Sequence, residues 1–155
     1  GVRVRISTNS LASTDNIQAF SGYYGQRDEL LEAGVELYEY RAHPAIKEEL
    51  IDRYPHIAIN DPEYALHAKS MVIDDKTVFI GTFNLDPRSA NLNTEVGMLA
   101  DSVELARQLT ASIERDIAPE NSWQTTPDFN PDSVVSKGTR FRMWLNRLLP
   151  LEPVL

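Results

Sequence analysis

The chain has 155 residues, of which 42% are hydrophobic and 25% are charged, a balance that fits one globular domain covering residues 1–155. A net charge of −8 at pH 7 makes nucleic acid an unlikely partner, because phosphate backbones are bound by basic surfaces. The chain has no cysteine, which excludes disulfides and thiolate metal sites, and no run of roughly 18 apolar residues that would span a membrane.

The first quarter of the sequence predicts a strand, helical segments and a second strand. Apolar and charged residues alternate over residues 2–8 and again over 35–40. Between them, cap-type residues at 13–15 precede two helical segments near 17–21 and 23–33, and Gly34 is a suitable stop. A strand, helix and strand in this order predict a parallel βαβ unit. We expect Asn9 and Ser10, just past the first strand, to serve in a turn.

Residues 41–64 form the least regular part of the sequence, and prolines punctuate it. A short helix is expected near residues 46–54. A metal site made of His43, His56 and Asp61 is one alternative, although their spacing matches no recognised ligand pattern. We favour a loop that shapes access to a neighbouring site.

The richest concentration of chemical groups follows at residues 66–95. Two β-prone runs, 66–73 and 77–80, are separated by a plausible tight turn. Side chains two residues apart on a strand share a face, so His67 and Lys69 are expected to project together. Imidazole can act as nucleophile, acid or base, and an ammonium beside it can stabilise a phosphoryl oxygen. Asp74 would point to the opposite face of the strand and lies at the turn, where we expect it to fix the structure.

Further polar residues come just after the second run. Gly81 allows a close backbone approach. Thr82 and Asn84 are two residues apart, so in extended chain their side chains point to the same side and both can donate hydrogen bonds there. Glu95 can hold the ring nitrogen of His67 that does not react. This design requires no metal, and we expect no cofactor.

The remaining third predicts a turn or short helix at 86–89, a strand at 93–100 that carries Glu95 at its start, and a long helix. Apolar residues three or four apart indicate that helix over 103–117, with a capping box formed by Asp101 and Glu104. Residues 121–130 are polar. The run 140–149 is basic and amphipathic, and it either lies on a lipid surface or packs within the protein.

The spacing of the central residues resembles a known motif. His67-x-Lys69, four residues, Asp74, six residues and then Gly81-Thr82-x-Asn84 resembles the HKD motif of the phospholipase D superfamily. Thr82 stands where that family often has serine, and the hydroxyl is retained. Three flanking segments are similar to the C-terminal half of bacterial cardiolipin synthases, namely residues 8–11, 33–39 and 149–152.

The resemblance implies an α/β fold, with a mixed, largely parallel sheet flanked by helices, and a phosphatidyltransferase activity. His67 would form a phosphohistidine intermediate or protonate the leaving alcohol. Lys69, Thr82 and Asn84 would bind the phosphate. The catalytic residues implied are His67, Lys69, Asp74, Asn84 and Glu95.

Family members use two such motifs, and this chain has one. The resemblance therefore implies a fragment of a two-motif protein that has little activity alone, with the second half in the same chain or in a dimer partner. Phosphatidylglycerol or phosphatidylethanolamine are the implied substrates, and the bacterial membrane surface the implied location. Two alternatives stay open: a homodimeric phosphodiesterase or nuclease of the same superfamily, and a non-catalytic half.

Overall fold

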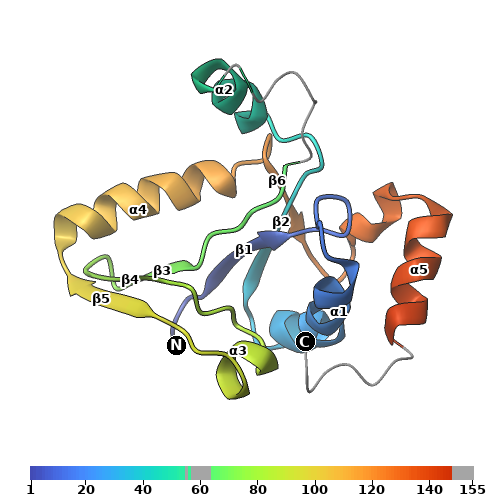
Figure 1. The fold of residues 1–155 in the computed structure, drawn as a ribbon, viewed down its shortest axis with the longest axis horizontal. Coiled ribbons are helices and arrows are strands. Elements are labelled where there is room, and N and C mark those ends of the chain that lie inside the picture. Colours follow the sequence, from blue (N-terminus) through green and yellow to red (C-terminus); the bar gives the residue numbers. More distant parts are fainter. Residues whose placement is uncertain (55, 57–63, 148–155) are drawn as a thin grey trace.

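The computed structural model describes residues 1–54, 56 and 64–147, which form two three-stranded sheets with helices around them (Figure 1). The first sheet has the order β1-β2-β6 and the second the order β3-β4-β5. The strands are β1 (Arg5–Asn9), β2 (Glu36–Tyr40), β3 (Ser70–Ile73), β4 (Thr77–Gly81), β5 (Gly97–Asp101) and β6 (Ser122–Thr125). The mixed α/β class is confirmed. "Largely parallel" is not, because among the described strands only β1 and β2 run parallel and the other pairs are antiparallel.

The predicted βαβ unit is present, with one correction. Its helix α1 (Ile17–Glu32) is continuous, where the sequence predicted two pieces, and it runs through Gly22. Asn16 is the cap, since its side chain accepts hydrogen bonds from the backbone N–H groups of Gln18 and Ala19. Gly34 follows the helix with φ of 83°, a left-handed conformation that favours glycine, so the predicted stop is confirmed.

Strand β6 was not predicted, because its sequence is polar. The structure pairs it antiparallel with β2, where Ser122 and Thr125 are buried. The Thr125 hydroxyl donates a hydrogen bond of 2.8 Å to the Glu39 carboxylate. The polar side chains of β6 are therefore buried against polar partners, and an apolar pattern does not reveal such a strand.

The second sheet is built on a hairpin. Asp74 and Asp75 lie in its turn between β3 and β4, with φ of 50° and 52°. At the other end, β4 and β5 approach closely: a side chain at Gly81 would lie 2.5 Å from the Val96 carbonyl oxygen, and Gly97 faces the Phe79 ring. Glycine is thus needed at position 81 for contact between strands of this sheet.

The helices complete the fold. They are α2 (Ile46–Arg53), α3 (Pro87–Asn91), α4 (Val103–Asp116), the 3₁₀ helix η2 (Pro131–Val134) and α5 (Lys137–Arg147). Helix α4 lies along β3 and β4, and α5 packs against α1 (Figure 1). The cap of α4 is Ser102, which accepts from the Leu105 N–H; the predicted capping residue Asp101 is instead the last residue of β5.

A buried ionic cluster holds the C-terminal segment to the βαβ unit. The Arg27 guanidinium donates to Glu39 at 3.0 Å and to Asp132 at 2.9 Å, and all three residues are buried. Burial raises the pKa of Glu39, while the charge of Arg27 and hydrogen bonds from Thr125 and Tyr23 oppose that rise. One cation thereby joins α1, β2 and η2.

Replacing Arg27 by alanine should strongly destabilise the fold. Two carboxylates would stay buried without their cation, and breaking a buried ion pair in this way costs about 3–5 kcal/mol. Urea unfolding measures the loss. Arg107→Ala, which removes a solvent-exposed pair with Glu104, is the matched control and should change stability little. Equal losses for the two variants would contradict the central role of the cluster.

Candidate functional site

The segment that leads into the predicted motif is anchored to the carboxyl ends of the two parallel strands. The Asn9 carboxamide, on the last residue of β1, donates to the Leu66 carbonyl at 2.9 Å and accepts from the Leu66 N–H at 2.7 Å. Two residues earlier, the Tyr64 ring stacks on Tyr40 of β2 with centroids 5.7 Å apart. These contacts place His67 where α/β sheets position functional groups.

His67 and Lys69 lie in extended chain just before β3, although the sequence predicted a strand beginning at residue 66. The His67 side chain is exposed and Lys69 is half-buried. The Lys69 carbonyl accepts a hydrogen bond of 3.0 Å from the Gly81 N–H, so the hairpin pairing extends as far as Lys69. The backbone next to the lysine is therefore held by β4.

The Glu95 carboxylate gathers several of the predicted groups at this end of the sheet. Thr82 donates its hydroxyl proton to Glu95 and takes a hydrogen bond of 3.0 Å from the Val96 N–H. The hydrogen bond from Thr82 is the main reason that the pKa of Glu95 lies below its usual value, with the positive charge of Lys69 contributing less. Glu95 is thus an ionised carboxylate close to Lys69 at neutral pH.

Arg88 is linked to the same carboxylate through an amide. Its Nε donates to Asn93 Oδ1 at 3.2 Å, and Asn93 Nδ2 donates to Glu95 at 3.2 Å. Arg88 stands in α3, where the Asp86 side chain caps the helix by accepting from the Ser89 N–H. The Asn93 side chain therefore connects Arg88 to Glu95.

One expectation about the motif differs from the geometry, which concerns Glu95, whereas Asp74 lies in the turn as its position in the sequence predicted. The partners of the Glu95 carboxylate are Thr82 and Asn93, where a bond to the His67 ring was expected. Asp74 lies in the hairpin turn, seven residues along extended chain from His67, or roughly 20 Å at the usual rise of a strand. The structure therefore joins Thr82 to Glu95 by a hydrogen bond and pairs the Lys69 backbone with Gly81, next to Thr82. It leaves Asn84 exposed on the loop after β4 and places Asp74 at the other end of the hairpin.

Asn9 is the residue whose role was underestimated. The sequence assigned it turn duty together with Ser10, and the structure confirms this for Ser10, whose hydroxyl accepts from the Ala12 N–H within the turn. Asn9 instead bonds to a segment 57 positions away. Its place at the end of a strand was the available signal, but a long-range partner cannot be read from local sequence.

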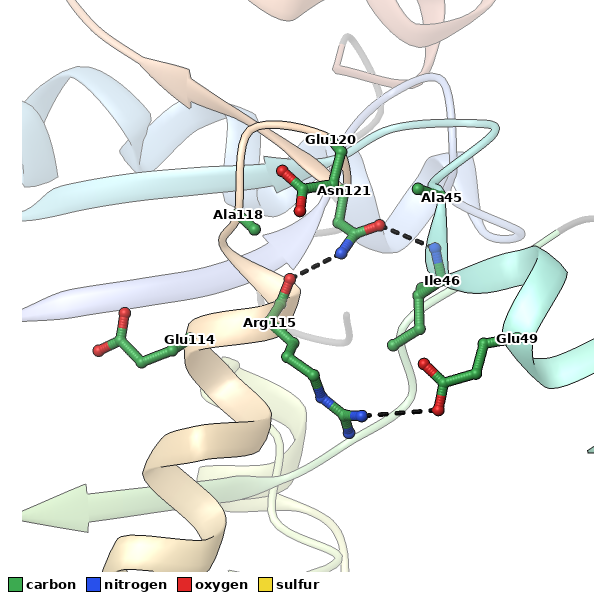
Figure 2. Close-up of a pocket in the computed structure, with 8 residues that line it drawn as sticks. All are labelled: Ala45, Ile46, Glu49, Glu114, Arg115, Ala118, Glu120 and Asn121. Atoms are coloured by element: carbon green, nitrogen blue, oxygen red, sulfur yellow. Dashed lines mark hydrogen bonds and ion pairs between the residues drawn. The ribbon is translucent and has the colours of Figure 1, made fainter.

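Two hollows mark the surface. One is an apolar groove of about 460 Å³ on the open face of the second sheet. It is lined by Met71, Ile73, Phe79, Phe83, Leu85, Glu95, Val96, Gly97 and Leu99. The other, of about 450 Å³, lies between α2, the end of α4 and the chain entering β6. There the Asn121 side chain bridges Ile46 and Arg115 (Figure 2), and none of the motif residues takes part.

The alternative metal set falls partly outside the described residues, because Asp61 is among those not described. Across residues 1–54, 56 and 64–147, no three histidine or carboxylate side chains gather as a metal site would require. In that same part of the chain, none of the helices combines the length and the apolarity that crossing a bilayer demands.

Comparison with known sequences identifies relatives for most of the chain. A family model described as "Cardiolipin synthase, PLD-like domain" matches residues 1–117. The chain is 46% identical over 107 residues to cardiolipin synthase C of Escherichia coli, an overlap that covers 69% of this chain and 22% of that protein. It is 37% identical over 91 residues to a cardiolipin synthase of Oceanobacillus iheyensis, covering 58% of this chain and 18% of the relative. The chain thus spans about a fifth of the length of these relatives.

A solved structure has a similar fold. Phosphatidylserine synthase of Haemophilus influenzae superposes with a TM-score of 0.55 and 14% sequence identity, and the match covers 100% of this chain and 36% of that one. At this identity the likeness establishes the fold alone.

Replacing Asn9 by alanine should release the segment before His67. The Leu66 amide would lose its acceptor, and its hydrogen exchange should speed up by about fivefold or more, as loss of one such bond implies. Asn9→Asp keeps an acceptor and should protect Leu66 better than alanine does. Exchange of the labelled backbone amides, followed by NMR, measures the effect.

The control is Asn16→Ala, which removes the cap of α1. It should lower global stability by about 1 kcal/mol and leave local exchange at Leu66 unchanged. Equal exchange at Leu66 in the Asn9→Ala and Asn16→Ala proteins would refute a local clamp.

Proposed function

The chain belongs to the cardiolipin synthase family of phospholipase D-like domains, and from that premise we propose that it carries one catalytic half of a phosphatidyltransferase. The observation that supports this most strongly is the grouping of Lys69, Thr82 and Glu95 at the end of the second sheet, with the exposed His67 two residues before the lysine. An exposed imidazole and an ammonium two residues apart suit attack on a phosphodiester.

The reaction proceeds by two displacements at phosphorus. In the first, a histidine ring nitrogen forms a bond to phosphorus, the bond to the leaving alcohol oxygen breaks, and a second histidine gives that oxygen its proton. In the second, an alcohol oxygen of another phospholipid attacks phosphorus and the phosphorus–nitrogen bond breaks. The second histidine, which lost its proton in the first displacement, now takes the proton of that alcohol. His67 takes one of these two parts, and the histidine of the second motif takes the other.

Lys69 and Asn84 bind the phosphoryl oxygens, and Thr82 joins them when its one hydroxyl proton moves from Glu95 to the phosphate. The ammonium of Lys69 balances the charge that builds on these oxygens in the transition state. Glu95 acts through its partners: as a carboxylate with a lowered pKa, it orients the Thr82 hydroxyl. Asp74 stands apart from the chemistry and shapes the hairpin turn.

The second motif belongs to another half, in the same polypeptide or in a dimer partner. The chain's short span relative to its relatives supports this. So does the apolar groove on the second sheet, where Ile73, Leu85 and Leu99 are 45%, 73% and 67% exposed. Large apolar side chains gathered on one face mark an interaction surface. A second half covering this groove would supply the second histidine that the reaction requires.

The substrates are phospholipids, with phosphatidylglycerol or phosphatidylethanolamine as donor and acceptor, and the protein works from the membrane surface as a peripheral protein. The relatives named as cardiolipin synthases support a lipid product. The decisive assay supplies phosphatidylglycerol and phosphatidylethanolamine to the complete two-motif protein, singly and mixed, and identifies the products by mass spectrometry. Release of headgroups without any new diphosphatidyl product would favour a phosphodiesterase.

In the complete protein, His67→Ala should reduce phosphatidyl transfer by at least about 10²-fold, because it removes the nucleophile or the acid. Arg88→Ala should weaken transfer less, since Arg88 reaches Glu95 only through Asn93. Initial rates with phosphatidylglycerol vesicles measure both. His43→Ala changes an exposed loop histidine and is the control. A His67→Ala protein whose transfer rate stays within a few-fold of that of the unaltered protein would contradict the catalytic role of His67.

The 155-residue chain alone should turn over at least about 10²-fold more slowly than the complete protein, because it supplies one of the two histidines required. The same vesicle assay, run on material whose mass in solution is determined by light scattering, checks this. Substantial turnover by a strictly monomeric chain would contradict the two-motif mechanism.

A further inference from the structure

Helix α5 combines a buried face and an apolar face that points away from the protein. Met143 is 6% exposed and packs in the cluster of Leu11 and Phe20, so this side of the helix is held against α1. Phe141, Trp144 and Leu145 are 61%, 50% and 51% exposed. At 100° per residue, Phe141 lies about 160° around the helix from Met143. The exposed residues therefore form one outward stripe, spaced three and four apart.

The stripe is ordered and is bordered by positive charge. The rings of Phe141 and Trp144 stack with centroids 5.8 Å apart. Arg140 and Arg142 are both exposed, one on each side of Phe141 around the helix. The sequence of α5 contains further basic residues and no acidic residue, although the whole chain has a net charge of −8. Positive charge is thus concentrated on one helix of an acidic protein.

We propose that this α5 face, made of Phe141, Trp144 and Leu145 with Arg140 and Arg142 beside them, is a docking surface for an anionic phospholipid bilayer. Aromatic and leucine side chains enter the boundary between headgroups and acyl chains, and arginines beside them pair with lipid phosphates. A protein partner would need acidic side chains placed opposite Arg140 and Arg142. An anionic bilayer presents negative phosphates over its whole surface and so meets these arginines without such placement.

The position of α5 agrees with this assignment. The family model ends at residue 117, so α5 lies beyond the matched domain. The helix is fixed to the frame through α1, at the edge of the molecule in Figure 1. The buried Arg27 cluster ties the segment just before α5 to β2. A bilayer bound to α5 would consequently hold the catalytic half at a defined orientation.

Trp144 provides a direct test with the 155-residue chain. The chain has two tryptophans, and Trp123→Phe leaves Trp144 as the one indole while keeping an aromatic ring under Arg41. Vesicles of equal parts phosphatidylglycerol and phosphatidylcholine should shift Trp144 emission to the blue, and brominated acyl chains should quench it. Pure phosphatidylcholine vesicles, or high salt, should weaken binding by about tenfold.

Two further variants keep Trp144 as the reporter. Phe141→Ser with Leu145→Ser should weaken vesicle binding by at least about tenfold, because two anchoring side chains are lost. Val103→Ser with Leu105→Ser alters two exposed apolar residues of α4, 66% and 45% exposed, and should bind as the parent does. Circular dichroism checks that both proteins are folded.

Unchanged Trp144 emission at saturating lipid, or equal binding by the α5 and α4 variants, would overturn the proposal and assign this face to a protein partner. The inference rests on the proposed function at a membrane surface, but its test needs no catalysis. A protein that transfers phosphatidyl groups without burying Trp144 refutes the docking surface alone. A complete two-motif protein that binds vesicles through α5 without transferring phosphatidyl groups refutes the proposed function alone.

Discussion

The two hydrogen bonds between the Asn9 carboxamide and the Leu66 backbone connect the two sheets of this structure. Asn9 ends the first strand, and Leu66 immediately precedes His67. A carboxamide carries both N–H donors and an acceptor oxygen, so it can satisfy the N–H and the C=O of one residue as a neighbouring strand would. The βαβ frame therefore holds the backbone next to His67 through a side chain that lies 57 positions from Leu66 in the sequence.

Charge is distributed unevenly, so that a strongly acidic chain still has cations in three distinct environments. Inside, Arg27 is enclosed by Glu39 and Asp132 and serves the fold. At the end of the second sheet, Lys69 lies near one carboxylate, Glu95, whose lone pairs are engaged by Thr82 and Asn93. On α5, arginines face solvent without acidic residues in the helix. Net charge alone describes none of these local environments.

Local sequence patterns predicted most of the elements and the motif, because both depend on short spacings. The stripe of α4, the stop at Gly34 and the hairpin turn at Asp74 were all recognised in this way. Strand β6 was missed because its buried residues are polar, and α1 was divided at Gly22 because a glycine weakens a helix without ending it. The partners of Asn9 and Glu95 required tertiary structure, since each bond joins segments that only folding brings together.

The central claim is that His67 and Lys69 face one phosphate. NMR of the 155-residue chain labelled with ¹⁵N-histidine tests it most directly, because the chain has three histidines and two of them serve as internal controls. Titration with inorganic phosphate should move the imidazole signals of His67 in step with the side chain of Lys69, while those of His43 and His56 stay in place. An unmoved His67, or equal movement of all three histidines, would contradict the account.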